Sequence, residues 1–281
     1  MNLSKRLMAA VDMVTEGFAV LDVGCDHAYT SIELVRRKSP CAVASDVRPG
    51  PLKAAGEHIA EAGLLDKITT VLADGVPRNI TKLLPENVPA SLVITGMGGM
   101  LIIKILSEAA ELLERFDELI LSPQSDIYAV RKFLVEQGYA FIDEAEILED
   151  GKFYTLMKVH PNSESAYTEL TSEQNELPGQ RRVTSKYGSH QDEQPNLVPG
   201  KSKDENQQDS LTELLSDAEL MYGPCLLRNK DETLRVYLAK RRNVLTDIKE
   251  KLIESGRGAD DIRIREINEE VRLIDEAERY Y

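Results

Sequence analysis

Short apolar runs rich in β-branched residues alternate with longer stretches of helical periodicity between residues 18 and 159. This alternation favours a parallel α/β domain, because parallel strands need a crossover connection and that connection is usually a helix. The apolar runs predict strands at Ala19–Val23, Cys41–Asp46, Thr69–Ala73, Leu92–Thr95 and Glu118–Ser122. Apolar residues three and four positions apart predict helices at Tyr29–Arg37, Pro51–Ala62, Met100–Glu114 and Ile127–Gln137.

Two further strands, Ala140–Leu148 and Phe153–Val159, end this region. They are joined by Glu149-Asp150-Gly151-Lys152, whose Asp-Gly pair favours a tight hairpin turn. A terminal antiparallel hairpin on an otherwise parallel sheet is typical of Rossmann-like methyltransferases rather than of dehydrogenases. We therefore expect residues 1–160 to form an α/β domain with a mostly parallel seven-stranded sheet.

The composition changes after this region. Residues 161–210 are rich in Gln, Ser, Asn, Glu, Pro and Gly and show no apolar periodicity, which predicts a disordered insertion. Residues 211–281 form the third predicted domain, and two long segments of it, Leu234–Leu252 and Ile264–Ile274, have apolar residues three and four apart. They predict an antiparallel, coiled-coil-like helical hairpin with its turn at Ser255–Gly258.

The charge balance limits how the chain can bind nucleic acid. With 34 Lys and Arg against 48 Asp and Glu, the formal net charge is −14. A protein that coats nucleic acid needs an excess of cations to displace counterions, so RNA binding would depend on local basic patches. The candidates are Lys5/Arg6, Arg36/Arg37/Lys38, Arg131/Lys132 and Lys240/Arg241/Arg242. Each of them could equally be a solvated helix face, so composition neither establishes nor excludes an RNA substrate.

No run approaches the roughly 18 uncharged apolar residues that span a bilayer, and the first residues lack the apolar block of a signal peptide. We expect a cytoplasmic protein without a membrane segment. The three cysteines, Cys25, Cys41 and Cys225, are widely spaced and form no C-x-x-C or Cys/His ligand pattern. We expect reduced thiols and no metal, and nothing in the sequence indicates a required protein partner.

The first strand runs into an acidic loop with a single glycine and then into a helix. A dinucleotide-binding loop would show G-x-G-x-x-G here, because its backbone must approach a pyrophosphate. This chain instead has Asp22, Gly24 and Asp26. S-adenosylmethionine carries a sulfonium and an amino acid end but no phosphate, so it suits an acidic loop. The alternative is a simple turn.

Two more acids follow strand ends. Asp46, with Val47 after it, stands where this fold accepts hydrogen bonds from a ribose diol. Asp74 could accept a hydrogen bond from an adenine amino group, and Gly75 would let the backbone come close. One such acid could be a helix cap, but acids at three successive strand ends indicate a cofactor crevice. The predicted cofactor-binding residues are Asp22, Gly24, Asp26, Asp46, Val47, Asp74, Gly75, Gly96, Met97 and Gly98.

The fourth strand runs into Gly96-Met97-Gly98-Gly99-Met100. Many amino-methylating enzymes carry an Asn/Asp-Pro-Pro-aromatic turn at this position, and that turn is absent here. A glycine-rich loop suggests close approach of the backbone to cofactor or target. The alternative is a tight strand-to-helix turn without a chemical role.

Four motifs together carry a resemblance: D-x-G-x-D-H-A-Y from Asp22, T-G-M-G-G from Thr95, Ser122-Pro123-Gln124 and Glu149–Tyr154. They resemble the bacterial tRNA (adenine-22-N1)-methyltransferases, the TrmK family, over Leu3–Val159. The resemblance continues over Leu220–Tyr281, where the family has a helical, coiled-coil-like domain. It implies a class I Rossmann-like fold, S-adenosylmethionine as methyl donor, and N1 of adenine 22 in tRNA as acceptor.

This chain departs from the family at three places. It has Thr30-Ser31 where the family usually has Leu-Pro, and Ser122-Pro123-Gln124 where the family usually has Gln-Pro-Asn. The stretch from Pro161 to Asp209 is an insertion relative to the family.

Methyl transfer to adenine N1 is an in-line displacement that demands orientation and electrostatics and needs no covalent nucleophile. The candidate catalytic residues are Asp26, His27 and Tyr29. Asp26 would hydrogen-bond the adenine amino group or stabilise the cationic methylated ring, and Tyr29 would stack on the flipped base. The alternative role of Asp26 is a helix N-cap, and the alternative for Tyr29 is a ring packed in the hydrophobic core. His27 could accept a proton or simply orient the loop.

Other readings of the chain stay open. The C-terminal helices would contact tRNA, with Lys240-Arg241-Arg242 as the first patch to neutralise, or they would form a plain dimerising or stabilising hairpin. A methyltransferase of a small metabolite would share the cofactor motifs. A non-catalytic RNA-binding or scaffold protein would leave the acids at three strand ends unexplained, and a nicotinamide dehydrogenase would lack its glycine pattern.

Overall fold

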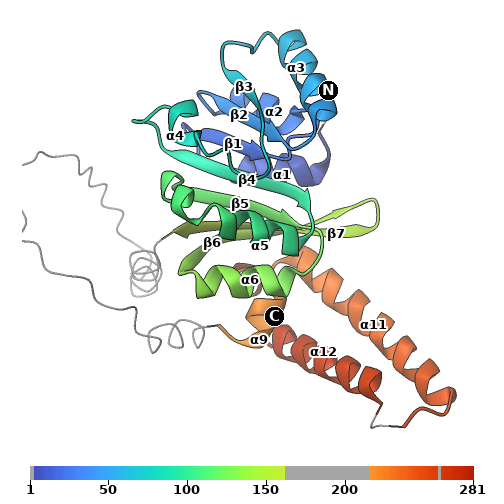
Figure 1. The fold of residues 1–281 in the computed structure, drawn as a ribbon. Coiled ribbons are helices and arrows are strands. Elements are labelled where there is room, and N and C mark those ends of the chain that lie inside the picture. Colours follow the sequence, from blue (N-terminus) through green and yellow to red (C-terminus); the bar gives the residue numbers. More distant parts are fainter. Residues whose placement is uncertain (1–2, 162–214, 259–260) are drawn as a thin grey trace, which may run out of the picture.

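The computed structural model describes residues 3–161, 215–258 and 261–281, and its centre is a seven-stranded sheet (Figure 1). The strands are β1 (Ala19–Val23), β2 (Ala42–Asp46), β3 (Ile68–Leu72), β4 (Ala90–Met97), β5 (Glu118–Pro123), β6 (Tyr139–Glu149) and β7 (Lys152–Pro161). Their spatial order is β3-β2-β1-β4-β5-β7-β6. The first five pair in parallel, whereas β7 is antiparallel to both β5 and β6. The predicted mostly parallel sheet with a terminal hairpin is confirmed.

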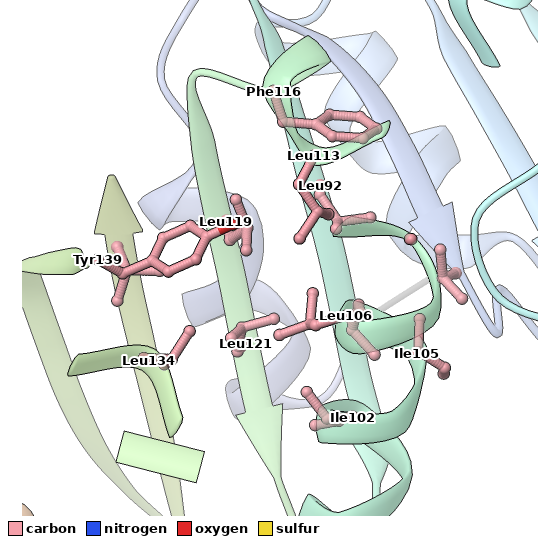
Figure 2. Packing of buried hydrophobic residues seen from close by; sticks show 14 of the residues in the cluster. Leu92, Ile102, Ile105, Leu106, Leu113, Phe116, Leu119, Leu121, Leu134 and Tyr139 are labelled. Carbon is pink, nitrogen blue, oxygen red and sulfur yellow. The ribbon is translucent and has the colours of Figure 1, made fainter. Parts of the chain in front are cut away.

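Helices cover both faces of this sheet. One face carries α1 (Lys5–Met13), α2 (Tyr29–Arg37) and α3 (Pro49–Glu61); the other carries α4 (Ile80–Leu83), α5 (Gly99–Glu108), the 3-10 segment η1 (Ala110–Arg115) and α6 (Ile127–Glu136). Successive residues of a strand point to opposite faces, so Leu21 packs with the α5 side and Val20 with the α2 side. Figure 2 shows Leu106 of α5 beside Leu121 of β5 in the first of these cores.

The helices differ from expectation in two places. The predicted helix Met100–Glu114 is two elements, because α5 ends at Glu108 and η1 begins at Ala110. The tighter 3-10 geometry brings Leu113 and Phe116 back into the core just before β5 begins. The sequence did not predict α1 or the single turn α4 either. Ser4 caps α1, which contributes only two fully buried side chains and so gives a weak apolar signal.

The C-terminal helices are α9 (Asp217–Tyr222), α10 (Pro224–Arg228), α11 (Glu232–Glu254) and α12 (Ile262–Glu278). The long pair, α11 and α12, lies antiparallel (Figure 1). Residues early in α11 contact residues late in α12, as when Arg242 pairs with Asp275, whereas Lys249 bonds Asn268 nearer the turn. The predicted helical hairpin is therefore present, and its coiled-coil character stays a prediction. The predicted insertion lies outside the described residues from residue 162 on.

A buried ion pair joins these helices to the sheet. Arg131 of α6 donates from Nε to Glu144 Oε1 of β6 at 2.8 Å, and both side chains are almost wholly buried. Arg131 also donates to the carbonyl of Met221 at 2.8 Å, while the backbone N–H of Cys225 donates to Glu144 Oε2 at 2.9 Å. Backbone groups of α9 and α10 thus complete the hydrogen bonding of a charged pair that would otherwise be costly to bury.

Arg131 belonged to one of the four basic patches named as candidates for RNA contact, each with a solvated helix face as its alternative. Because Arg131 is buried in this pair, it is neither of the two. The division of the chain at residues 160 and 211 stays a prediction, since Leu220 and Cys225 pack into the core of the sheet.

None of the helices in the described ranges combines the length and the apolar character needed to cross a lipid bilayer.

Candidate active site

One cavity of about 400 Å³ lies at the carboxyl ends of the parallel strands β1, β2, β3 and β4. This is where ligands bind in open α/β sheets, because the strand order reverses between β1 and β4 and leaves a crevice there. Of the predicted site residues, those lining it are Asp22, Gly24, Asp26, His27, Tyr29, Asp46, Val47, Asp74, Gly75, Gly96 and Met97. Gly98 does not line it; it caps the N-terminus of α5.

Asp22 is a buried carboxylate at the end of β1. Only 2% of its surface is exposed, and its Oδ2 accepts a hydrogen bond of 2.6 Å from the Ser31 hydroxyl. Burial, opposed by the Ser31 hydrogen bonds and reinforced by the charge of Asp46, raises the pKa of Asp22 to about 6. A cation placed in the cavity would stabilise the ionised form, so this position favours a positively charged ligand.

Asp46 lies at the end of β2 and is also buried, at 4% exposure. Its Oδ1 accepts a hydrogen bond of 2.8 Å from the backbone N–H of Arg48, and the Arg48 guanidinium Nε lies 3.6 Å away. This bond holds one carboxylate oxygen in place, so the geometry suits a fixed acceptor for a diol. Asp74, after β3, is exposed on the cavity rim, and Gly75 beside it has a φ of +76°.

The loop between β1 and α2 has an unusual backbone. Gly24, Asp26 and Ala28 have φ values of +73°, +49° and +58°, in the left-handed region that costs an L-residue roughly 1 kcal/mol or more. The positive φ favours glycine at position 24, and a Cβ there would also displace the end of the Met97 side chain. Ala28, not Asp26, is the N-cap of α2. The helix-cap alternative for Asp26 is therefore excluded, and its side chain is 63% exposed at the cavity.

Three aromatic rings cluster at the rim of this cavity. The ring centre of Tyr29 lies 5.5 Å from that of His27 and 4.8 Å from that of His58 of α3, with interplanar angles of 23° and 29°. The two histidine rings are also 5.5 Å apart, so the three centres form a triangle. The Tyr29 hydroxyl and His58 Nε2 are 3.3 Å apart, and His58 Nδ1 is 3.1 Å from the carbonyl oxygen of His27. Tyr29 is half-buried and lines the cavity, so it is not the core ring that was its alternative.

The glycine-rich loop after β4 divides into two parts. Gly96 and Met97 line the cavity, as close backbone approach to a ligand requires. A Cβ on Gly99 would meet the Ser125 carbonyl at 2.3 Å, so this glycine is needed for packing at the start of α5. The tight-turn alternative therefore describes Gly98 and Gly99, whereas the approach of a ligand to Gly96 stays a prediction.

Several lining residues were given no site role by the sequence: Arg6, Leu7, Val23, Cys25, Thr30, Arg48, Ala73, Thr95, Leu101, Ile105 and Gln124. Gln124 and Thr95 stand at strand ends, a signal that could have found them. Arg6 belongs to α1, whose place beside the cavity depends on long-range packing that no local pattern reveals.

Two further observations limit the kinds of reaction that the cavity can support. Burial raises the pKa of the Cys25 thiol, so this lining residue does not supply a thiolate nucleophile. Within the ranges that the structure describes, no three His, Cys, Asp or Glu side chains cluster as a metal site would.

The C-terminal basic patch is largely neutralised by α12. Arg241 donates to both carboxylate oxygens of Glu270, and Arg242 pairs with Asp275 and Glu278. Lys240 differs, since its ammonium lies 5.5 Å from the centre of the Phe153 ring on the β6–β7 hairpin. Only Lys240 of this patch thus lacks an acidic partner in the described residues.

Comparisons with known proteins show which proteins the chain is similar to. A family described as a methyltransferase domain matches residues 3–157. The tRNA (adenine(22)-N(1))-methyltransferase of Bacillus subtilis is 32% identical over 158 residues, which are 56% of this chain and 64% of that protein. A candidate tRNA methyltransferase of Mycoplasma pneumoniae is 33% identical over 59% of this chain and 73% of its own length.

The similarity to solved structures covers more of the chain than the similarity to the curated sequences does. A candidate tRNA (m1A22) methyltransferase of Streptococcus pneumoniae is 25% identical, with a TM-score of 0.71 over 98% of this chain and 99% of its own. The same Streptococcus protein in complex with S-adenosyl-L-methionine matches with a TM-score of 0.68, over the same shares of the two chains. The structural likeness thus extends through the C-terminal helices, beyond the reach of the curated sequence matches.

Proposed function

Because the chain belongs to the TrmK family of tRNA methyltransferases, we propose that it transfers a methyl group from S-adenosylmethionine to N1 of adenine 22 in tRNA. The observation that carries this proposal is the cavity on which the ends of β1, β2 and β3 converge, each with an aspartate. A tRNA substrate also supports a cytoplasmic location.

The cavity fits the chemistry of S-adenosylmethionine. Asp22 favours a cation, which matches the ammonium and sulfonium of the donor. Asp46 offers carboxylate oxygens to a ribose diol, and Asp74 offers an acceptor to an adenine amino group. Gly24 and Gly75 let the backbone approach closely, since a side chain at either would be strained. We propose that these residues, with Val47, Gly96 and Met97, bind the cofactor.

When bound, S-adenosylmethionine supplies the electrophilic methyl group. The residues of this chain then need only to hold the adenine in line, exclude water and stabilise the positive charge that develops on the ring. We propose that Tyr29, held in contact with the His27 and His58 rings, stacks on the flipped base, and that the exposed carboxylate of Asp26 faces the cationic ring. His27 orients this loop through its stack on Tyr29.

The C-terminal helices are proposed to contact tRNA away from the target base, because RNA is recognised largely through its shape and backbone. The ion pairs along α11 and α12 leave Lys240 as the cation of the predicted patch that is available for a phosphate. It stands on α11 next to the β6–β7 hairpin, whose Tyr154 is in turn covered by Arg6.

Transfer of labelled methyl from S-adenosylmethionine to unmodified tRNA tests the proposal. Two transcripts are compared, one with adenine at position 22 and one with guanine there. We expect labelling of the adenine transcript only. Cofactor binding without transfer to either transcript would contradict the proposal and favour a small-molecule acceptor.

A further inference from the structure

Two polar side chains lie near the backbone of Gly96 at the β4 end of the cavity. A Cβ placed on Gly96 would lie 3.6 Å from Arg6 Nη1 and 3.8 Å from Gln124 Nε2. The three residues come from β4, α1 and the segment after β5, and all three line the cavity. Because Gly96 has no side chain, the space beside both polar groups stays open.

Gln124 is held by its backbone and not by its side chain. Its N–H donates to the carbonyl of Met97 at 2.8 Å, which fixes the residue against the glycine-rich loop. Its exposed side-chain amide has no hydrogen-bond partner in residues 3–161, 215–258 and 261–281. One donor and one acceptor group are therefore available to a ligand at this end of the cavity.

The proposed reaction restricts which edge of adenine the protein can read. N1 must face the methyl donor, so the N1 position cannot also be occupied by a recognising side chain. The N6 amino group and N7 remain, a donor next to an acceptor. A glutamine amide matches this pair, because its carbonyl accepts from N6 and its NH₂ donates to N7. Guanine presents O6 and N7, two acceptors, and would set O6 against the amide carbonyl.

We propose that Gln124 is a specificity-determining residue that selects adenine through N6 and N7; this inference rests on the proposed function. Arg6 alone would favour guanine, because a guanidinium matches O6 and N7. The ring of Tyr154 lies 5.2 Å below its guanidinium carbon and holds it by a cation–π contact, while Gln124 supplies the acceptor that adenine needs.

The test pairs a side-chain change with a change of one substrate atom. Wild type and Gln124→Ala are each assayed on tRNA carrying adenosine or 7-deazaadenosine at position 22, the latter having C–H in place of N7. Any intrinsic change in N1 reactivity is common to both enzymes and cancels in the comparison. Gln137→Ala, an exposed glutamine at the far end of α6, is the matched control.

We expect the deaza substitution to lower kcat/KM for the wild type and for Gln137→Ala about tenfold more than for Gln124→Ala, as a lost base contact would. Gln124→Ala should also lose about tenfold on ordinary adenosine and keep its affinity for S-adenosylmethionine, which shows that the fold is intact. Equal deaza effects in wild type and Gln124→Ala would overturn the inference, with the proposed function still standing. No transfer by the wild type to ordinary adenine 22 would overturn both.

Discussion

Replacing Asp22 with asparagine should make the ligand-free protein more stable and its cofactor complex weaker. Burial raises the pKa of this carboxyl from 3.8 to about 6, a difference of about two units, which corresponds to about 3 kcal/mol at 1.36 kcal/mol per unit. Because the folded state holds the proton more tightly than the unfolded state, the charged form is penalised as pH rises from 3.8 to 6. The penalty is complete above pH 6 and absent below 3.8.

The Asp22→Asn substitution removes this penalty, while the side-chain oxygen of the new amide can still accept from the Ser31 hydroxyl. The added NH₂ group needs a partner of its own, so we expect a net gain of about 1–2 kcal/mol at pH 7.5. For a chain of this size that is roughly 2–6 °C in melting temperature. At pH 5 the wild-type carboxyl is mostly protonated when folded, so its penalty is smaller by about 1–2 kcal/mol, whereas the cost of the added NH₂ group is unchanged. The gain should therefore fall to near zero at pH 5.

The assay is thermal melting of wild type and Asp22→Asn at both pH values, followed by calorimetric binding of S-adenosylmethionine. Wild-type affinity should fall as pH drops through 6, and the variant should bind about tenfold more weakly at pH 7.5 with little pH dependence. Ser107→Ala, a helix-surface change in α5, controls for unspecific effects. A variant less stable than wild type at pH 7.5, or one with the same pH dependence of binding, would refute the reasoning.

Three further changes test other parts of the structure. His58→Ala removes the imidazole that packs against the Tyr29 ring and contacts its hydroxyl, and it should lower kcat/KM about tenfold with cofactor affinity unchanged. A parallel loss of cofactor binding would contradict a positioning role. Arg131→Met leaves Glu144 buried without its cation and should lower the free energy of unfolding in urea by about 3–5 kcal/mol. Adding Glu144→Gln should recover part of this loss. A loss below about 1 kcal/mol would contradict the stabilising role of the buried pair. Lys240→Glu should weaken tRNA binding severalfold and lower its salt slope by about 1, with Arg242→Ala as the paired control, and an unchanged dissociation constant would end the role proposed for Lys240.

Local patterns predicted the strands because each is short, apolar and bounded by a turn. β1 and α2 begin and end at the predicted residues, since the Asp-x-Gly loop between them permits one chain path. β3 is shifted by one residue, because its exposed edge position leaves Thr69 and Thr70 without an apolar alternation to mark the register. Burial on both faces did not by itself fix the bounds, since β4, which is buried over its first five residues, extends two residues beyond the predicted Leu92–Thr95 at each end.

The part of the site that lies at strand ends was predictable from the sequence. Acids and glycines that follow strand ends meet at one edge of a parallel sheet whatever the rest of the chain does, so Asp22, Asp46 and Asp74 could be placed from sequence order alone. His58 and Arg6 could not be placed in this way. Their positions depend on how α3 and α1 pack, and no spacing along the chain encodes that packing.

The cavity as proposed must favour a cationic cofactor within a chain of net charge −14 that also binds an anionic polymer. Differences in burial allow the same cavity to attract a cationic cofactor and its rim to accept an anionic polymer. Asp22 and Asp46 are nearly inaccessible, so their charge acts over short distances inside the cavity, where the dielectric is low. Arg48 is 69% exposed on the lining, and Arg6 lies at the β4 end, so cations stand where a phosphate would pass. Charge placement at this rim, rather than the net charge, then determines whether RNA can approach, because solvent screens distant surface acids within about 8 Å at physiological salt.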